Sequence, residues 1–230
     1  NIAMHVKNIT STHTFFKDLG NFKPAERNND TLNRVVLESF MATYFMDRWK
    51  SPLKDICFFL NDNLKEEMIA TLNQELDSIA EVMRHSVAEM FTSKNSFLWF
   101  VLYHKFCETG IPSERFMDFM EEFKTNLHSK EWHGKTFDDM NKVSTKKKSC
   151  IIEKLQLLED FMQEFLFLAD EEKEKAAAFN QEYHKYNDLV REGDYYRIAS
   201  YRENNMYDCW QVVSQDRSES LVTYVQARFE

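Results

Sequence analysis

The chain has 230 residues, 43% of them hydrophobic and 29% charged, a composition that is typical of a folded globular protein and excludes intrinsic disorder. Only 4 glycines and 3 prolines occur. An all-β protein needs turn residues about every 8–12 positions, so this shortage argues against that class. The formal net charge of −9 disfavours a protein that binds nucleic acid over its whole surface, although a local basic patch stays compatible with it.

The first ninety residues predict three helices after an irregular start. Residues 1–29 are polar and weakly periodic, so no regular element is expected there. Ser51-Pro52 is a helix start signal because proline is favoured at the first helical position, and Asn61-Asp62-Asn63 breaks the pattern that follows. The expected helices are one capped by Asp30 or Thr31 with apolar positions from Leu32 to Tyr44, a short one from Pro52 through Leu60, and a long one over about 64–91 with apolar residues three and four apart.

The middle of the chain predicts three more helices and a polar loop. Thr109-Gly110-Ile111-Pro112 combines a helix C-cap with a stop signal and therefore separates two helices. The helix before it is apolar on most sides, which places it at the centre of the core. The expected elements are helices over 97–108 and 113–127, a polar loop over 128–144 that contains Gly134, and a helix over about 146–167 capped by Ser144 or Thr145.

The composition changes at Ala169-Asp170, where a charged and alanine-rich stretch begins that is helical by propensity and ends at Gly193. After it the hydrophobic period changes from about 3.6 to 2, and turn clusters at 203–205 and 214–217 separate three short strands. Three strands alone are marginally stable, so we expect them to pack on helices or on another chain. The predicted fold class is mainly α: a multi-helix bundle over 1–168, followed by a helix and a C-terminal three-stranded antiparallel β-meander over 169–230, α+β overall.

The four cysteines predict a reducing compartment. They lie far apart and form no Cys-x-x-Cys pair, so we expect reduced thiols at Cys57, Cys107, Cys150 and Cys209. No apolar run reaches the length of about 18 residues that a membrane-spanning helix needs, and no signal-peptide pattern opens the chain. The expected location is cytoplasmic, with no membrane contact.

No complete catalytic constellation is present in the sequence, and we predict no catalytic residue, no metal ligand and no cofactor. His85 with Glu89 and His104 with Glu108 have the i,i+4 spacing of two ligands on one helix. The further convergent ligands are missing, so we expect structural or surface roles. Asp138-Asp139 could act as paired carboxylates, but neighbours on a polar loop are usually solvated.

A run of lysines is the one candidate binding site. Lys146, Lys147 and Lys148 stand at the predicted start of a helix, where cations oppose the helix dipole. Such a run needs a compensating partner, and a phosphate backbone would supply it. These three lysines are therefore candidate nucleic-acid-binding residues, against the alternative of an ordinary solvated surface.

Residues 24–167 resemble the helical lobe of the GmrSD-type restriction family, whose members carry a ParB-like nuclease lobe. The resemblance rests on Glu26–Arg34 at a helix start, Phe91–Phe97 before an apolar helix, and Val143–Ser149 before another. It implies a role in contacting foreign DNA. The family's nuclease motif, a stretch similar to Asp-Gly-Gln-Gln-Arg, is missing here, so the resemblance implies no nuclease activity.

Residues 170–230 are similar to the C-terminal end of the bacterial α-galactosidases of glycoside hydrolase family thirty-six. The matching stretches are Gly193–Ile198 and Trp210–Val222, closing on Tyr224. In that family the catalytic aspartates lie on a barrel that precedes this segment. Asp139-Met140-Asn141 shares part of the nucleophile motif but lacks its tryptophan and strands, so that role is not carried over.

Together these observations predict a non-catalytic helical module of a restriction or defence protein that contacts nucleic acid or a partner subunit. One alternative is a fragment or accessory segment of an α-galactosidase-like enzyme. The other is a helical protein–protein interaction module. The two resemblances also predict that parts of different ancestry are joined near residues 167–175, by a natural fusion, by engineering or by the assembly of fragments.

Overall fold

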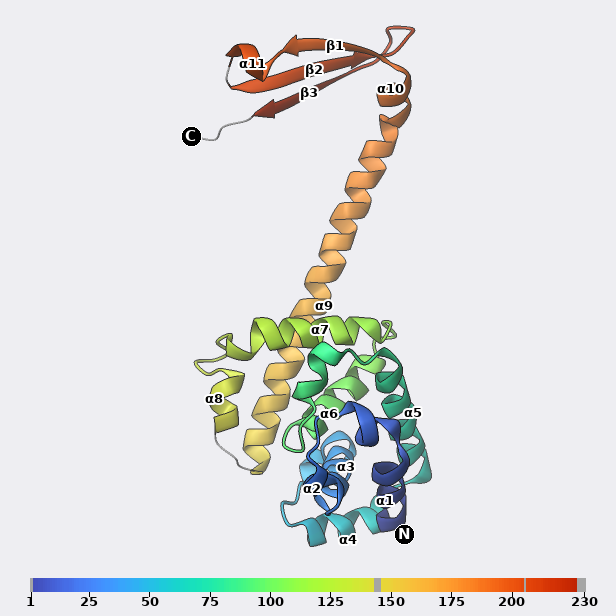
Figure 1. The fold of residues 1–230 in the computed structure, drawn as a ribbon, viewed down its shortest axis with the longest axis vertical. Coiled ribbons are helices and arrows are strands. Elements are labelled where there is room, and N and C mark those ends of the chain that lie inside the picture. Colours follow the sequence, from blue (N-terminus) through green and yellow to red (C-terminus); the bar gives the residue numbers. More distant parts are fainter. Residues whose placement is uncertain (1, 143–145, 205, 227–230) are drawn as a thin grey trace. The chain divides into compact units, whose positions relative to one another are not determined.

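The computed structural model describes residues 2–142, 146–204 and 206–226, with backbone alone for 168–185, 187 and 188. The fold is mainly helical and ends in a three-stranded antiparallel sheet, as the sequence predicts (Figure 1). The chain forms two compact units, Asn1–Phe165 and Leu166–Glu230, where the sequence places the boundary at 168/169. Within the described ranges, no helix is both long and apolar enough to cross a membrane.

Over residues 2–90, the first half of the helical unit contains five α-helices and three short turns of other helix types. Its elements are α1 (Ile2–Thr12), the π-helical turn η1 (Phe15–Leu19), α2 (Pro24–Arg27), α3 (Thr31–Tyr44), η2 (Met46–Arg48), α4 (Leu53–Asn63), α5 (Glu66–Val82) and η3 (His85–Met90).

The second half of this unit contains the helix that lies at the centre of the core, α6 (Ser96–Cys107). The other elements of this half are α7 (Glu114–Thr125), η4 (Leu127–Ser129), α8 (Phe137–Lys142) and the first part of α9 (Lys148–Lys185). The side chains from Ser96 to Tyr103 are all buried, and α6 packs against α3 and α5. The prediction that this apolar helix lies at the centre of the core is confirmed.

The expectation of an irregular start is wrong, because residues 2–27 contain α1, η1 and α2. Ile2, Val6 and Ile9 are buried at helical spacing on α1, and Phe15 and Phe16 of η1 are at most 1% exposed. The apolar stripe of α1 is short, and most of its other residues are polar. The segment folds because α1 packs against α3 and α4, and η1 packs against α5.

The long helix predicted over 64–91 is also interrupted. α4 runs through the expected break to Asn63, whose side chain donates a hydrogen bond of 2.8 Å to the Phe59 carbonyl. α5 ends at Val82, and Arg84 adopts an extended backbone. There its guanidinium pairs with Asp118 at 2.7 Å and with Glu121 at 2.6 Å. These two ion pairs to α7 hold the chain in the break before η3.

The predicted polar loop over 128–144 contains a helix, α8, which the sequence prediction missed. Thr136 caps it, since its hydroxyl accepts the backbone N–H of Asp139 at 3.1 Å. Phe137 is 4% exposed and packs edge-to-face on Phe123 with a ring distance of 5.1 Å. A single buried aromatic residue therefore anchors this short helix to α7. The predicted caps Ser144 and Thr145 lie outside the described residues.

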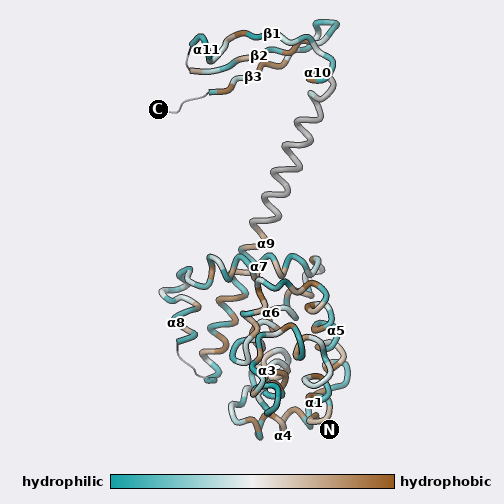
Figure 2. The backbone as a smooth tube through the Cα atoms, viewed as in Figure 1, coloured by the Kyte–Doolittle hydropathy of each residue, from teal (hydrophilic) through white to brown (hydrophobic). Residues whose placement is uncertain are grey.

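The second unit contains the end of α9, α10 (Asn187–Glu192), β1 (Asp194–Ala199), α11 (Tyr201–Asn204), β2 (Tyr207–Val213) and β3 (Ser220–Gln226). The strand order is β1-β2-β3, and both pairs are antiparallel, so the predicted meander is confirmed. Gly193 ends α10 where it meets the sheet: a Cβ there would lie 2.6 Å from Val212 Cγ1. Figure 2 shows hydrophobic stretches on the strands of this sheet.

Candidate functional site

Lys146, the first of the predicted binding lysines, neutralises a buried acid. Its ammonium lies 2.7 Å from Oε2 of Glu38, whose side chain is 1% exposed, and Arg34 donates to Oε1 of the same carboxylate at 2.8 Å. The ammonium also stands 4.4 Å from the centre of the Phe97 ring. The Lys146 carbonyl accepts a 2.9 Å hydrogen bond from the Trp49 indole. Lys146, just before α9, therefore links this part of the chain to Glu38 on α3 and to Phe97 on α6.

The other two predicted lysines lie on the surface. Lys147 and Lys148 are both exposed, and Lys148 donates a hydrogen bond of 2.8 Å to the backbone carbonyl of Asp47. A carbonyl carries no net charge, so this contact orients the Lys148 ammonium without neutralising it.

Two further lysines join this group from elsewhere in the chain. Lys94, before α6, donates to the Asn141 carbonyl, and Lys154 of α9 donates to the Asn141 side-chain oxygen at 2.9 Å. Both acceptors are neutral. We define the basic cluster as Lys94, Lys146, Lys147, Lys148 and Lys154.

The pKa of Lys154 depends on its burial and on the other charges of the basic cluster. Its side chain is 6% exposed. Burial, followed by the positive charges of Lys94 and Lys146, lowers the pKa of Lys154 from 10.5 to about 8, and Cys150 opposes this change. Burial is the larger cause, and the two neighbouring cations act in the same direction, so positive charge gathers around Lys154.

The depressed pKa of Lys154 predicts a rise in stability at alkaline pH. Between pH 8 and 10.5 this lysine is neutral in the folded chain and protonated in the unfolded chain, so unfolding takes up a proton. We expect the free energy of unfolding of the wild type, relative to Lys154→Met, to rise with pH through this window and to level off above it. Urea titrations at a series of pH values measure the difference. A difference that stays flat would contradict the burial of Lys154 beside two other lysines.

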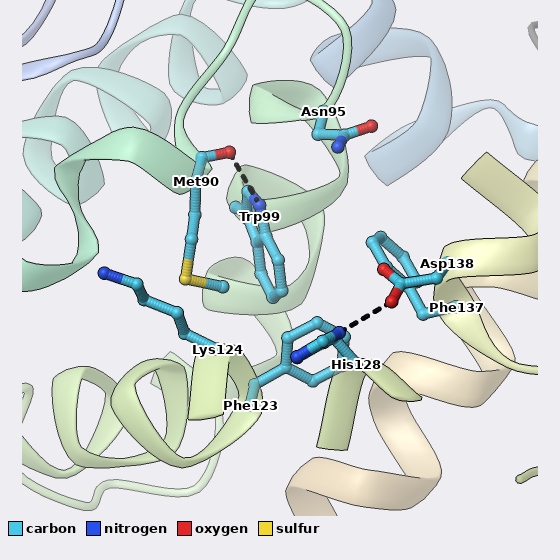
Figure 3. A pocket seen from close by; sticks show the side chains of 8 residues that line it. All are labelled: Met90, Asn95, Trp99, Phe123, Lys124, His128, Phe137 and Asp138. Carbon is cyan, nitrogen blue, oxygen red and sulfur yellow. Dashed lines mark hydrogen bonds and ion pairs between the residues drawn. The ribbon is translucent and has the colours of Figure 1, made fainter. Parts of the chain in front are cut away.

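A separate pocket with a volume of about 230 Å³ opens between the α6 start, the α7 end and α8 (Figure 3). At its mouth His128 Nδ1 lies 2.7 Å from Asp138 Oδ2, and Lys124 forms an ion pair of 2.7 Å with Glu89. The buried Asn95 Oδ1 has no hydrogen-bond partner. The lining residues are Met90, Asn95, Trp99, Phe123, Lys124, His128, Phe137 and Asp138.

The pocket lacks the parts of a hydrolytic site. His128 and Asp138 form the base-and-orienter half of a triad, but none of the eight lining residues has a hydroxyl or thiol that could act as the nucleophile. Its three aromatic walls, Trp99, Phe123 and Phe137, are at most 4% exposed and belong to the core. The free acceptor at Asn95 suits a water molecule, which needs a polar partner in a small cavity.

Two of the remaining sequence candidates, His104 and Asp139, have partners within the fold. His104 Nδ1 lies 2.5 Å from Glu75 Oε1 on α5, and this hydrogen bond raises the pKa of His104. Asp139 binds Lys142 at 2.8 Å, which lowers the pKa of Asp139, whereas Asp138 lies 2.7 Å from His128, so the two carboxylates have different partners. In the part of the chain that the structure describes, no three His, Cys, Asp or Glu side chains converge on a metal site.

No protein-family model, curated protein or solved structure matches this chain. The resemblances to restriction proteins and to α-galactosidases therefore stay predictions, and the function has to be argued from the contacts of the chain itself.

Proposed function

We propose that the helical unit is a non-catalytic module that binds the phosphate backbone of nucleic acid through the basic cluster. The convergence of Lys94 and Lys154 on the neutral Asn141, with Lys146 close enough to act on the same buried ammonium, carries the proposal. Glu38 offsets the charge of Lys146, whereas Lys94 and Lys148 donate to neutral carbonyls, so the positive charges of these two lysines can attract an anion even in a chain with a net charge of −9.

The geometry of the cluster favours a polyanion over a single small anion. Lys94 precedes α6, whereas Lys148 begins α9, so the charges are spread over the surface where two helices start. Helix N-termini add positive potential to such a surface. Successive phosphates along a backbone can meet these separate charges, which a single phosphate ion cannot do.

The role without catalysis agrees with what the restriction-family resemblance implies for residues 24–167. Contact with nucleic acid is the part of that prediction that the basic cluster supports. All four cysteines are free thiols, which supports the cytoplasmic location that we include in the proposal.

A salt titration with paired variants tests the proposal. We expect fluorescence anisotropy to detect binding of a labelled duplex DNA at low salt, with an affinity that falls as salt rises. The double variant Lys94→Ala/Lys148→Ala removes two cations that donate to neutral carbonyls and leaves the Glu38 pair intact. It should weaken binding about tenfold at low salt and flatten the slope of log K against log salt by about two.

The matched control is Lys17→Ala/Lys65→Ala, which changes the net charge equally. Lys17 on η1 and Lys65 before α5 are exposed, and α5 stands on the far side of the helical unit from the start of α9 (Figure 1). The control should bind as the wild type does. Equal loss in both variants, or no binding at low salt, would reject the basic cluster as a nucleic-acid site and favour the protein-interaction alternative.

A further inference from the structure

In its described residues, the outer edge of β3, the last strand of the sheet, lacks the sequence features that usually protect an edge strand. In the described part of the chain β3 pairs with β2 on one side and with no strand on the other. Its seven residues, Ser220-Leu-Val-Thr-Tyr-Val-Gln226, contain no charge, no proline and no glycine. Val222, Tyr224 and Val225 are 54%, 56% and 50% exposed. Sheet edges usually carry charges, prolines or bulges that prevent pairing with another chain, and β3 carries none of them.

The opposite edge of the same sheet is protected. β1 contains Asp194 and Arg197, and its register with β2 shifts between Arg197 and Ala199, as at a β-bulge. Charges and bulges are the usual means by which an edge strand avoids pairing. The contrast within one sheet singles out β3 as an edge that is suited to pairing.

We propose that β3 pairs antiparallel with β3 of a second copy of this chain, so that two three-stranded sheets join into one of six strands. A three-stranded sheet is marginal by itself, and a longer sheet pairs the backbone groups that the β3 edge leaves open.

The side chains of β3 fit a copy of the same strand. In a two-fold pairing centred on Thr223, Val222 meets Tyr224 of the second copy, and Leu221 meets Val225. Thr223 meets its own counterpart, and Ser220 meets Gln226. Aromatic with β-branched, apolar with apolar and threonine with threonine are favourable cross-strand pairs, and no like charges are opposed. This self-complementarity is the reason that the partner is a second copy.

The pairing closes at two chains. A two-fold interface uses the β3 edge of both copies, and the edges that then remain are the two protected β1 strands. The assembly is therefore a dimer and not a fibre.

A charge-swap experiment on the full chain tests the dimer. Light scattering coupled to size exclusion, over a range of concentrations, should give twice the mass of one chain. Thr223→Lys and Thr223→Glu each oppose like charges across the two-fold axis, so each should raise the dimer dissociation constant at least about tenfold. An equimolar mixture of the two variants should restore the dimer, because lysine then meets glutamate. This rescue separates a lost interface from a lost fold.

The matched control is Ile198→Lys on β1, since Ile198 is 57% exposed on the protected edge. It should leave the dissociation constant unchanged. Hydrogen exchange of the unmodified chain gives a second readout: amides in residues 220–226 should exchange more slowly at high than at low protein concentration.

Three results would overturn the inference: a monomer at all concentrations, a dimer that Thr223→Lys leaves intact, or a mixture that fails to re-form the dimer. The inference does not depend on the nucleic-acid proposal, whose test residues Lys94 and Lys148 belong to the other unit. Either can therefore fail alone.

Discussion

Replacing Glu38 with glutamine is expected to lower the free energy of unfolding by about 3 kcal/mol. The Glu38 carboxylate is 1% exposed and is held by Arg34 at 2.8 Å and by Lys146 at 2.7 Å. Removing its charge leaves two cations close together without their shared partner. The side chains of Arg34 and Lys146 are 37% and 27% exposed, so water compensates part of the lost ion pairing. The expected decrease in the free energy of unfolding therefore lies at the low end of the range for buried pairs. Urea unfolding followed by circular dichroism measures the change.

Asp139→Asn is the matched control for Glu38→Gln, because it also neutralises one acid in an ion pair with a lysine. The Asp139–Lys142 pair is exposed on both sides, at 54% and 75%, so we expect no resolvable change in stability. Lys146→Met should cost less in the Glu38→Gln background than in the wild type, because it then removes an unpaired cation. Additive effects of Glu38→Gln and Lys146→Met would contradict the described pairing.

The elements predicted correctly from the sequence have strong local signals. α3, α6 and α7 were predicted within a few residues of their observed bounds, because apolar residues recur at helical spacing or a Gly-Ile-Pro stop divides them. The meander was predicted because its period changes to two after Gly193 and turn clusters separate the strands. Such signals lie within about ten residues, and a single sequence displays them.

The elements that were missed depend on distant contacts. The break at Arg84 is held by Asp118 and Glu121 of α7, and α8 is anchored by the packing of Phe137 on Phe123. The sequence around these residues shows an unbroken helical pattern in one case and a polar loop in the other. Tertiary contacts overrode both local patterns.

The candidate site was predicted in part, for the same reason. The lysine run stands out in the sequence, but the partner of Lys146, Glu38, lies 108 residues earlier and resembles any surface acid on an amphipathic helix. Lys94 and Lys154 converge because both bind Asn141. No spacing in the sequence predicts that these side chains converge, so the basic cluster can be recognised only in the folded chain.

Phe15 is the residue best suited to test whether the N-terminal helices, which the sequence did not predict, pack on the core. The Phe15 ring is fully buried and lies 5.1 Å from both the Phe91 and the Phe100 rings, in edge-to-face geometry. Phe91 follows η3 and Phe100 belongs to α6, so Phe15 links the first helices to the central helix of the core. Aromatic pairs of this geometry add to the free energy that burial already contributes.

Phe15→Ala is therefore expected to lower the free energy of unfolding by about 4 kcal/mol, because it removes a buried ring and leaves a cavity between α6 and η1. Phe58→Ala is the matched control: the Phe58 side chain is 64% exposed, and its loss should change stability by less than about 0.5 kcal/mol. Chemical unfolding of the two variants in parallel gives both values. Similar small effects would mean that residues 2–27 do not pack on the core, whereas a large difference between the two establishes the N-terminal helices as part of it.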